Sequence, residues 1–333
     1  MTWLRFLLLG LLTAVLFILN IFFGAVHIDA SVVLDILTGY GIDDDPLNFI
    51  ILESRLPQAI TALLAGAALG VSGLLLQTAF RNPLAGPSVL GISSGASLGV
   101  ALVILFMGGQ IAIAGYEIAG NAAIIAAALA GSLAIMALLM FFSMRLRSEL
   151  MLLVVGMMTG YLTSSVVTLL SSLSTAQGVH GYVMWGMGTF GAVSSARIPV
   201  FTLLVAVGLI LSLLLAKPLN LLLLGDNYAR NLGVRVHRVR NLLLLVTGVL
   251  TAIVTAYCGP VAFIGLAMPH VARMIMRTDN HWILIPATML SGAAVALGCN
   301  VLSVLPDSTV IPVNALTPVV GVPVILYVIF CRK

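Results

Sequence analysis

Long apolar runs separated by short polar segments dominate the chain. A helix that crosses a bilayer needs about 20 mostly apolar residues. Ten such runs lie at residues 4–26, 57–79, 88–107, 119–142, 150–172, 197–216, 240–258, 261–276, 282–304 and 312–331. The pattern predicts an all-α polytopic membrane protein with ten transmembrane helices, forming a single transmembrane domain over 1–333. The first run is too long for a cleaved signal peptide and lacks a clear cleavage motif, so it is expected to remain a helix.

Composition excludes the soluble and disordered classes. Of 333 residues, 61% are hydrophobic and 8% are charged, whereas soluble domains carry about 25% charged residues. Disorder requires low hydrophobicity and high charge. Cys258, Cys299 and Cys331 lie in or next to apolar runs without metal-site spacing, which predicts small apolar filler and neither a disulfide nor a zinc site.

The few charged residues divide unequally between the two sides of the membrane. With the N-terminus inside and the spans alternating, the inner segments hold 13 of the 15 basic residues and 3 of the 11 acidic residues, a net +10 against −6 outside. Short cytoplasmic loops of membrane proteins show this excess of Lys and Arg. Both termini are therefore predicted to be cytoplasmic. The basic excess indicates topology and contact with anionic lipid, and no nucleic acid partner.

The apolar spans lack the groups that energise transport. No Asp, Glu or His lies within Ile118–Phe142 or Asn241–Pro269, and proton-coupled carriers bury such residues along the ion path. Backbone carbonyls could still bind sodium. The two lysines, Lys217 and Lys333, stand outside any Gly-Lys-Ser/Thr loop. The chain is thus predicted to be no enzyme and to bind no ATP, cofactor or metal, so an ATPase would be another chain.

Glycines recur four residues apart within the spans. The steps lie at Gly66 and Gly70, at Gly91, Gly95 and Gly99, and at Gly156 and Gly160. Such steps let helices approach closely in lipid. Tight helix packing is favoured, and a transport path lined by small residues is the alternative.

Polar motifs stand between the spans. Arg55 precedes Pro57, which suits a first helical turn, and it is either an interfacial anchor or a docking charge for an acidic outer partner. The inner loop at about 218–240 has Asp226 as a predicted N-cap and Gly233 at the C′ position. Between them we expect one short helix with Ala229 and Leu232 on one side, as a knob for a cytoplasmic partner or an ordinary loop helix at the headgroups.

Further motifs complete the set. Prolines and glycines around Asn82 and Pro83 predict irregular backbone at the inner face, and Pro269 predicts a broken eighth span near that face. His270 has no second ligand at helical spacing, so a hydrogen-bonded structural histidine is favoured over a metal ligand.

Together these segments resemble the permease family of type II ABC importers, which takes up iron-siderophores, haem and vitamin B12. The matching residues are Arg55-Leu56-Pro57, 66–77, Asn82-Pro83-Leu84-Ala85, Leu90-Gly91, Trp185-Gly186-x-Gly188, Gly225-Asp226-x-x-Ala229-x-x-Leu232-Gly233, Phe263-Ile264-Gly265-Leu266-x-x-Pro269-His270 and Gly321-x-Pro323. The chain departs from the family pattern at Gln58, Val310, Asn314 and Pro318, where a basic residue, Glu, Gly and Ala are usual.

The resemblance implies a homodimer in the bacterial cytoplasmic membrane, with a central path, two cytoplasmic ATPase subunits that bind ATP and Mg, and a periplasmic or lipid-anchored binding protein. It places ATPase coupling at Gly225, Asp226, Ala229, Arg230, Leu232 and Gly233, and binding-protein docking at Arg55. It places a cytoplasmic gate at Ser148, Glu149 and Leu150, and path contacts at His180, Tyr182, Trp185 and Met187. Interfacial packing is the alternative for those four.

Two other functions remain open at this stage. An ion-coupled secondary carrier would work without an ATPase, and a channel or scaffold would need no knob at 225–233. The uncharged span interiors and the knob favour the ATP-driven importer, which would work by alternating access. The sequence leaves ferric siderophore, haem and cobalamin open as substrates.

Overall fold

The computed structural model describes residues 2–39, 46–108, 110–113, 116–146, 149–305 and 310–331. The helices that precede the single β-hairpin of the described residues are α1 (Thr2–Phe22), α2 (Ala30–Leu37), α3 (Pro46–Asn48), the π-helix η1 (Phe49–Arg55), α4 (Leu56–Ala79), α5 (Ile92–Ala101) and the π-helix η2 (Leu102–Phe106). Strands β1 (Gln110–Ile113) and β2 (Tyr116–Ala119) pair antiparallel, with Gln110 opposite Ala119.

The elements described in the second half of the chain are all helices. Its elements are α6 (Asn121–Arg145), α7 (Glu149–Leu173), α8 (Ala176–Gly186), the 3-10 turns η3 (Phe190–Ala192) and η4 (Ser195–Arg197), α9 (Ile198–Leu214), α10 (Ala216–Leu223), α11 (Asp226–Asn231), α12 (Val236–Cys258), α13 (Ile264–Met276), α14 (His281–Val304) and α15 (Val313–Cys331).

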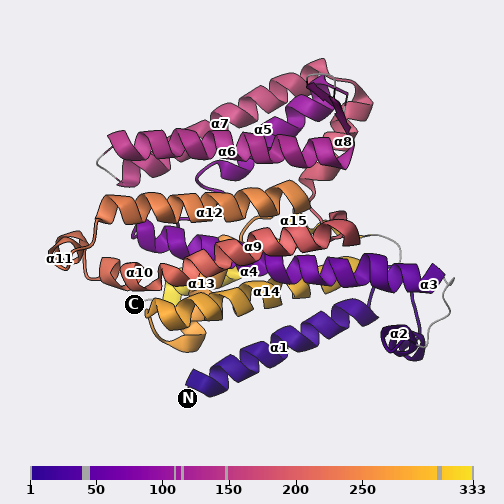
Figure 1. Cartoon of the computed structure of the whole chain (residues 1–333), viewed down its shortest axis with the longest axis horizontal. Helices are drawn as coiled ribbons and strands as arrows, with labels where there is room; N and C mark the ends of the chain where they lie inside the picture. Colours follow the sequence, from indigo (N-terminus) through magenta and orange to yellow (C-terminus); the bar gives the residue numbers. More distant parts are fainter. Residues whose placement is uncertain are drawn as a thin grey trace.

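Every predicted apolar run falls on a helix. Seven helical segments are long and apolar enough to cross a membrane, and the runs at 92–106, 264–276 and 313–327 form shorter apolar helices. The chain is accordingly a helical polytopic membrane protein. Both chain ends lie at the end of the molecule that carries α11, whereas α2, α3 and α8 lie at the opposite end (Figure 1).

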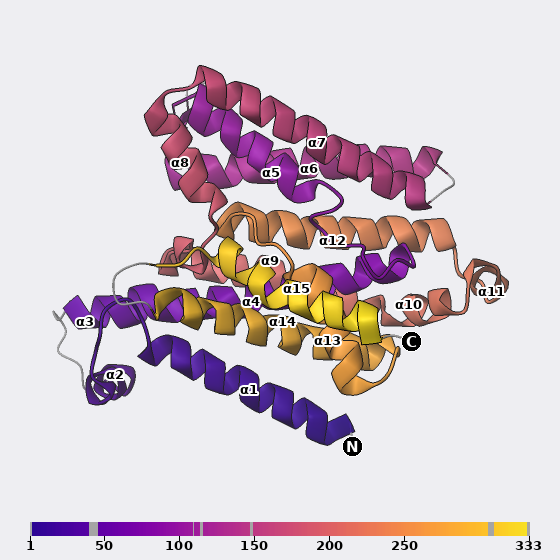
Figure 2. The ribbon, with the colours of Figure 1, turned by 180° about the vertical axis from the view of Figure 1, so that it is seen from behind.

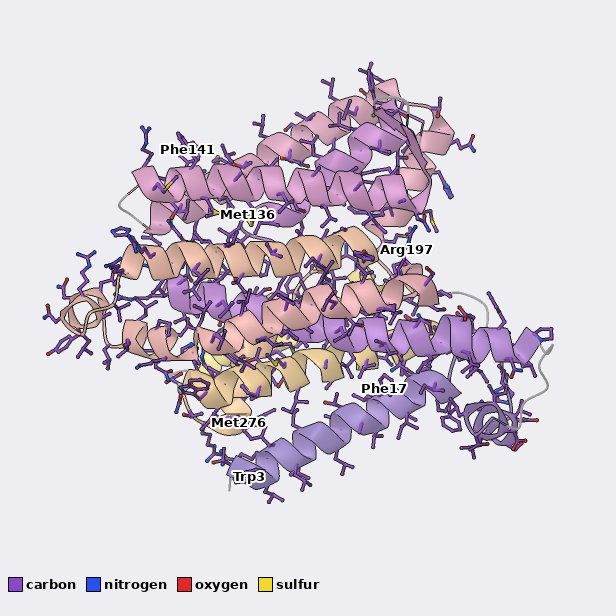
Figure 3. The ribbon with its side chains drawn as sticks, viewed as in Figure 1. Trp3, Phe17, Met136, Phe141, Arg197 and Met276 are labelled. Carbon is purple, nitrogen blue, oxygen red and sulfur yellow. The ribbon has the colours of Figure 1, made fainter. Side chains whose placement is uncertain are left out.

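Helix α4 forms the centre of the molecule and is buried along most of its length. It packs against α14, α12, α13 and α9, while α5, α6 and α7 form a second group on the far side of α12 (Figure 2). Met136 of α6 lies in the seam between that group and α12 (Figure 3). A Cβ added to Gly248 of α12 would come within 2.3 Å of the Met136 sulfur.

The glycine steps lie where backbones meet. A Cβ on Gly66 would stand 2.2 Å from the carbonyl oxygen of Gly292 in α14, and one on Gly99 would stand 2.1 Å from the carbonyl oxygen of Ala127 in α6. Real side-chain carbons do not approach carbonyl oxygens this closely, so each position needs glycine. The packing interpretation of these steps is confirmed, except that a Cβ on Gly160 would meet its nearest atom, the Ser94 hydroxyl oxygen, at an ordinary 3.5 Å.

The second span begins earlier than predicted. Helical backbone runs without a break from Pro46 to Ala79, 34 residues, and Pro57 is the second residue of α4, in the first turn of that α-helix as predicted. The seven residues before Leu56 are a π-helix. This wider turn changes the hydrogen-bond pattern locally, where proline removes a donor. Sequence periodicity does not predict such a turn.

Candidate functional site

Arg55 has 4% of its surface exposed and lies at the end of the molecule that carries α2, α3 and α8. In the predicted topology this is the outer end, and the end that carries α11 is the inner end. Its guanidinium donates to the carbonyl oxygens of Ile21 at 2.9 Å and Phe22 at 2.8 Å, and also to that of Val26. The carbonyls of Ile21 and Phe22 end α1 and lack partners within the helix, and Val26 follows it in the chain. Arg55 therefore caps α1 and is buried in this structure, and its docking of a binding protein stays a prediction. At the other end of α1, Arg5 donates to the carbonyl oxygen of Met276 at 3.0 Å.

Gln58, one turn beyond Arg55, also points inward. Its amide donates to Asn300 of α14 at 2.9 Å, and Asn300 donates to Asn20 of α1 at 2.6 Å. Three helices are thereby joined by side-chain amides near the outer end. A basic side chain, usual in the resembling family at this position, could not take the buried place of this amide without exposing or pairing its charge.

At the inner end, Asp226 is the centre of a charge cluster. It accepts two hydrogen bonds from Arg240 of α12, at 3.0 and 3.1 Å, and one from Arg81, which follows α4. Arg240 also donates to the carbonyl oxygen of Ala79, at 3.2 Å. The Arg240 Nη2 donates to both oxygens of the Asp226 carboxylate, and hydrogen bonds between ionised partners are among the stronger polar contacts in proteins. Asp226 thus ties the loop to the ends of α4 and α12.

The inner loop differs from the prediction in two respects. Gly225, with φ +106°, is the N-cap of α11, and Asp226 is its first helical residue, which frees the carboxylate for the arginines. Ala229 is fully buried, whereas Leu232 is 58% exposed, so the two do not share a face. Gly233 does take the predicted C′ position with φ +83°.

The loop presents apolar side chains beyond the end of the bundle. Tyr228 is 68% exposed, and Leu223, Leu224 and Leu232 are exposed as well. Arg230 lies in the last turn of α11. Figure 1 shows α11 standing clear of the long helices. An exposed apolar group held on a rigid, ion-paired loop is typical of a protein contact site.

A second polar cluster joins α4 to α13. Arg273 donates to Gln77 at 2.7 Å, and Gln77 donates to the carbonyl oxygen of Leu266 at 3.1 Å. The His270 Nε2 lies 2.9 Å from the carbonyl oxygen of Pro83 and 3.5 Å from the Gln77 amide nitrogen. His270 is buried and hydrogen-bonded, as the structural interpretation predicts.

The loop before α5 has the irregular backbone that its prolines predict. Asn82 folds the turn, because its side-chain oxygen accepts from the backbone nitrogen of Leu84 at 2.9 Å and its carbonyl from that of Ala85 at 3.0 Å. Gly91, with φ +75°, starts α5. A Cβ on Gly91 would stand 2.9 Å from the carbonyl oxygen of Gly156 in α7. The loop therefore connects α4 to the α5–α7 group at close range.

The break in the eighth span lies before α13. Residues 259–263 are not helical, and Phe263 has φ +63°. Pro269 lies within α13 and has no N–H to offer the Gly265 carbonyl. That carbonyl oxygen approaches α4 so closely that a Cβ on Gly73 would stand 1.5 Å from it. Helices α4 and α13 therefore cross at close range, because Pro269 leaves the Gly265 carbonyl free and Gly73 has no side chain in its way.

Of the predicted cytoplasmic gate, Ser148 lies outside the described residues. Glu149 is the first residue of α7, and Leu150 follows it with an exposed side chain. The C-terminal end of α6 and the N-terminal end of α7 lie at the same end of the molecule as α11 (Figure 1). The structure therefore places this part of the predicted gate at the inner end.

The predicted path residues divide between two faces of α8. Tyr182 and Trp185 pack inward against Ala96 and Val100 of α5, and burial raises the pKa of the Tyr182 hydroxyl. His180 and Met187 are exposed. The interfacial-packing alternative therefore fits the two aromatic residues.

A seam of backbone contacts fixes the end of α8. The backbone nitrogen of Thr189 donates to the Cys258 carbonyl at 2.8 Å, and that of Asn314 donates to the Met187 carbonyl at 3.2 Å. The Asn314 side chain adds a bond of 3.3 Å to the Gly186 carbonyl. The glycine usual in the resembling family at 314 could not make this last bond, so the departure strengthens the seam.

A cavity of about 200 Å³ lies beside this seam, between α6, α8 and α12. It is lined by residues that include Asn121, Met184, Trp185 and Tyr257. The sequence analysis missed Met184, although its spacing of four from His180 signals a shared helix face. It also missed Arg240 and Arg81 as partners of Asp226, because nothing local in the sequence pairs residues so far apart. Among the described residues, no three His, Cys, Asp or Glu gather as a metal site.

Comparison with known proteins gives consistent matches over nearly the whole chain. The FecCD transport family matches residues 12–331. The chain is 34% identical over 297 residues to the hemin transport system permease protein HmuU of Yersinia pestis, covering 87% of this chain and 86% of that protein. It is 35% identical over 283 residues to the vitamin B12 import system permease protein BtuC of Klebsiella pneumoniae, covering 85% and 82%.

The fold is also similar to a solved structure. An inward-facing conformation of a protein described as a metal-chelate type ABC transporter superposes with a TM-score of 0.84 at 29% identity, covering 98% of this chain and 99% of that one.

Proposed function

Because this chain belongs to the FecCD transport family and is the permease of a type II ABC importer, we propose that it imports an iron-siderophore, haem or cobalamin-type substrate by alternating access. In this proposal it acts as a homodimer of ten-span subunits in the bacterial cytoplasmic membrane, with both termini inside. A separate ATPase drives it, and a binding protein delivers the substrate. The chain supplies the path and the contacts, and it carries out no chemistry.

The inner loop is the observation that carries this proposal. Its exposed Tyr228 and Leu232 stand on α11, which Asp226 ties through Arg240 to α12 and through Arg81 to the end of α4. A force applied to α11 by a partner would reach two long helices through these ion pairs. An ion-coupled carrier has no use for such a loop, so the loop favours an ATP-driven importer.

Co-purification tests the proposal directly. The chain is expressed with the ATPase encoded beside it, and the amount of ATPase retained is compared for the wild type, Leu232→Arg and Met144→Arg. Met144 is exposed at the inner end of α6 and serves as the matched control. A central apolar contact is worth about 2 kcal/mol or more, so Leu232→Arg should lower retention by about 30-fold and Met144→Arg should not. Failure of any ATPase to co-purify with the wild type would refute the proposal.

Labelled uptake separates the three substrate classes. Cells that express the complete importer receive a ferric siderophore, haem or cobalamin, and accumulation is compared with that of a Leu232→Arg strain. The transported class should accumulate only where the ATPase is retained. Equal accumulation in both strains would contradict coupling through the loop.

A further inference from the structure

Helix α8 carries two different faces. Tyr182 and Trp185 turn into the bundle, where they pack with α5. The opposite face carries His180, Met184 and Met187, all exposed, the two methionines by 53% and 38%. These three residues are spaced by four and three positions, which places neighbouring side chains about 5–6 Å apart at their Cβ atoms.

This His/Met face, formed by His180, Met184 and Met187, stands on a fixed support. At the start of α8, the side-chain oxygen of Thr175 caps the helix by accepting from the backbone nitrogen of Gly178 at 3.2 Å. At its end, the bonds from Asn314 to the carbonyls of Gly186 and Met187 hold the last turn. α8 lies at the end of the molecule opposite α11 (Figures 1 and 2). In the proposed topology this is the side where substrate arrives.

The donor atoms of the face suit soft and borderline metal centres. Imidazole nitrogen and thioether sulfur are borderline and soft ligands, and in proteins both serve as axial ligands of haem iron. A hard ion held by oxygen donors gains little from either. None of the three residues is a carboxylate, the group that hard cations prefer. Met184 also lines the cavity beside Trp185 and Tyr257, so aromatic walls adjoin the face.

We infer that His180, Met184 and Met187 form an entry site for a metal macrocycle with an exchangeable axial position, with haem as the representative. This inference rests on the proposed importer function and narrows its substrate class. The imidazole of His180 binds the metal from its open axial side, and the thioethers of Met184 and Met187 receive it as the macrocycle advances along the helix. A ferric siderophore, whose oxygen donors already fill the iron coordination sphere, finds no ligand there.

Hemin titration tests the site. The permease–ATPase complex in lipid nanodiscs is titrated with hemin, and the Soret band reports axial ligation. The wild type should shift the band to that of a low-spin, ligated haem. His180→Gly should weaken binding by at least tenfold, and added imidazole should restore the shifted band. The double variant Met184→Leu, Met187→Leu keeps the side-chain volume and should weaken binding by a smaller factor.

Met144→Leu is the matched control, because Met144 is exposed on α6 far from α8, and it should bind hemin as the wild type does. Binding of unchanged strength by His180→Gly would overturn the inference, as would a wild-type complex that leaves the hemin spectrum unshifted. In either case the importer proposal still stands or falls on retention of the ATPase, so the two failures are distinguishable. Size-exclusion profiles of each variant show that any loss of binding comes from a folded complex.

Discussion

Replacing Gly73 by alanine should destabilise the protein more than any ordinary glycine-to-alanine change in a helix. The new Cβ would stand 1.5 Å from the carbonyl oxygen of Gly265, whereas a carbon–oxygen contact needs about 3.3 Å. The α4 and α13 backbones would have to separate by about 2 Å. Overpacking in a core costs about 1–3 kcal/mol, and here the obstacle is backbone, so we expect a loss of about 3 kcal/mol.

Thermal unfolding in detergent, followed with a thiol-reactive dye, measures this loss. Cys258 and Cys299 are each 1% exposed, so they react when the helices separate. At about 2–4 °C per kcal/mol, Gly73→Ala should lower the midpoint by about 6 °C or more. Gly298→Ala in α14 is the matched control, since nothing lies within 4 Å of the added carbon, and it should not lower the midpoint. Equal midpoints for the two variants would refute the argument from the close crossing.

Asp226→Asn should lower the free energy of unfolding by about 1–3 kcal/mol, because it removes the charge that pairs with Arg240. The difference in melting midpoint between this variant and the wild type should shrink at high salt, where the pairing is screened. Asn314→Gly should open the outer seam more often and raise the labelling rate of Cys258 by a membrane-impermeant thiol reagent about fivefold, the equivalent of one hydrogen bond. Asn300→Leu should lower the melting midpoint by the equivalent of about 1–3 kcal/mol, because the amides of Gln58 and Asn20 lose their shared partner.

Each of these three has a result that would count against it. A melting difference for Asp226→Asn that does not depend on salt would mean that the carboxylate acts by shape and not by charge. An unchanged labelling rate in Asn314→Gly would show that the backbone bonds alone close the seam. A stable Asn300→Leu protein would show that the amide chain contributes nothing to holding α1.

The sequence predicted the helices well because lipid leaves little choice. A chain with so few charges must satisfy its backbone within helices, and each of the ten predicted apolar runs contains a helix. The glycine steps also followed from a local rule, since close approach requires the smallest side chain. Local rules could not identify the partners that side chains find in distant parts of the chain. Arg55 looks like a free outer charge until the end of α1 is placed against it, and Asp226 looks like an N-cap until Arg240 arrives from the next helix.

The candidate site was predicted in the same uneven way. The family resemblance named the loop at 225–233, and the structure shows why it is suited to a partner, with Leu232 outward and Ala229 inward. It also gave the same role, contact with the transport path, to four residues of α8 and its C-cap, yet the helix directs two of them inward and two outward. Residue types and spacing alone could have grouped His180 with Met184, but which face points inward depends on α5, and only the assembled bundle shows that.

The length of helix α1 matches the thickness of the hydrocarbon core of a typical bilayer. Its 21 residues span about 32 Å, close to the roughly 30 Å hydrocarbon core of a typical membrane. Arg5 is tied to α13 at one end and Arg55 closes the other, so neither end can slide to follow a thinner or thicker membrane. Helix α4, with 24 residues, is about 36 Å long by the same rise, and the helical segment before it, from Pro46, extends it further past the hydrocarbon core. Hydrophobic mismatch should therefore act on α1 first, and transport should be fastest in lipids whose acyl chains match its length.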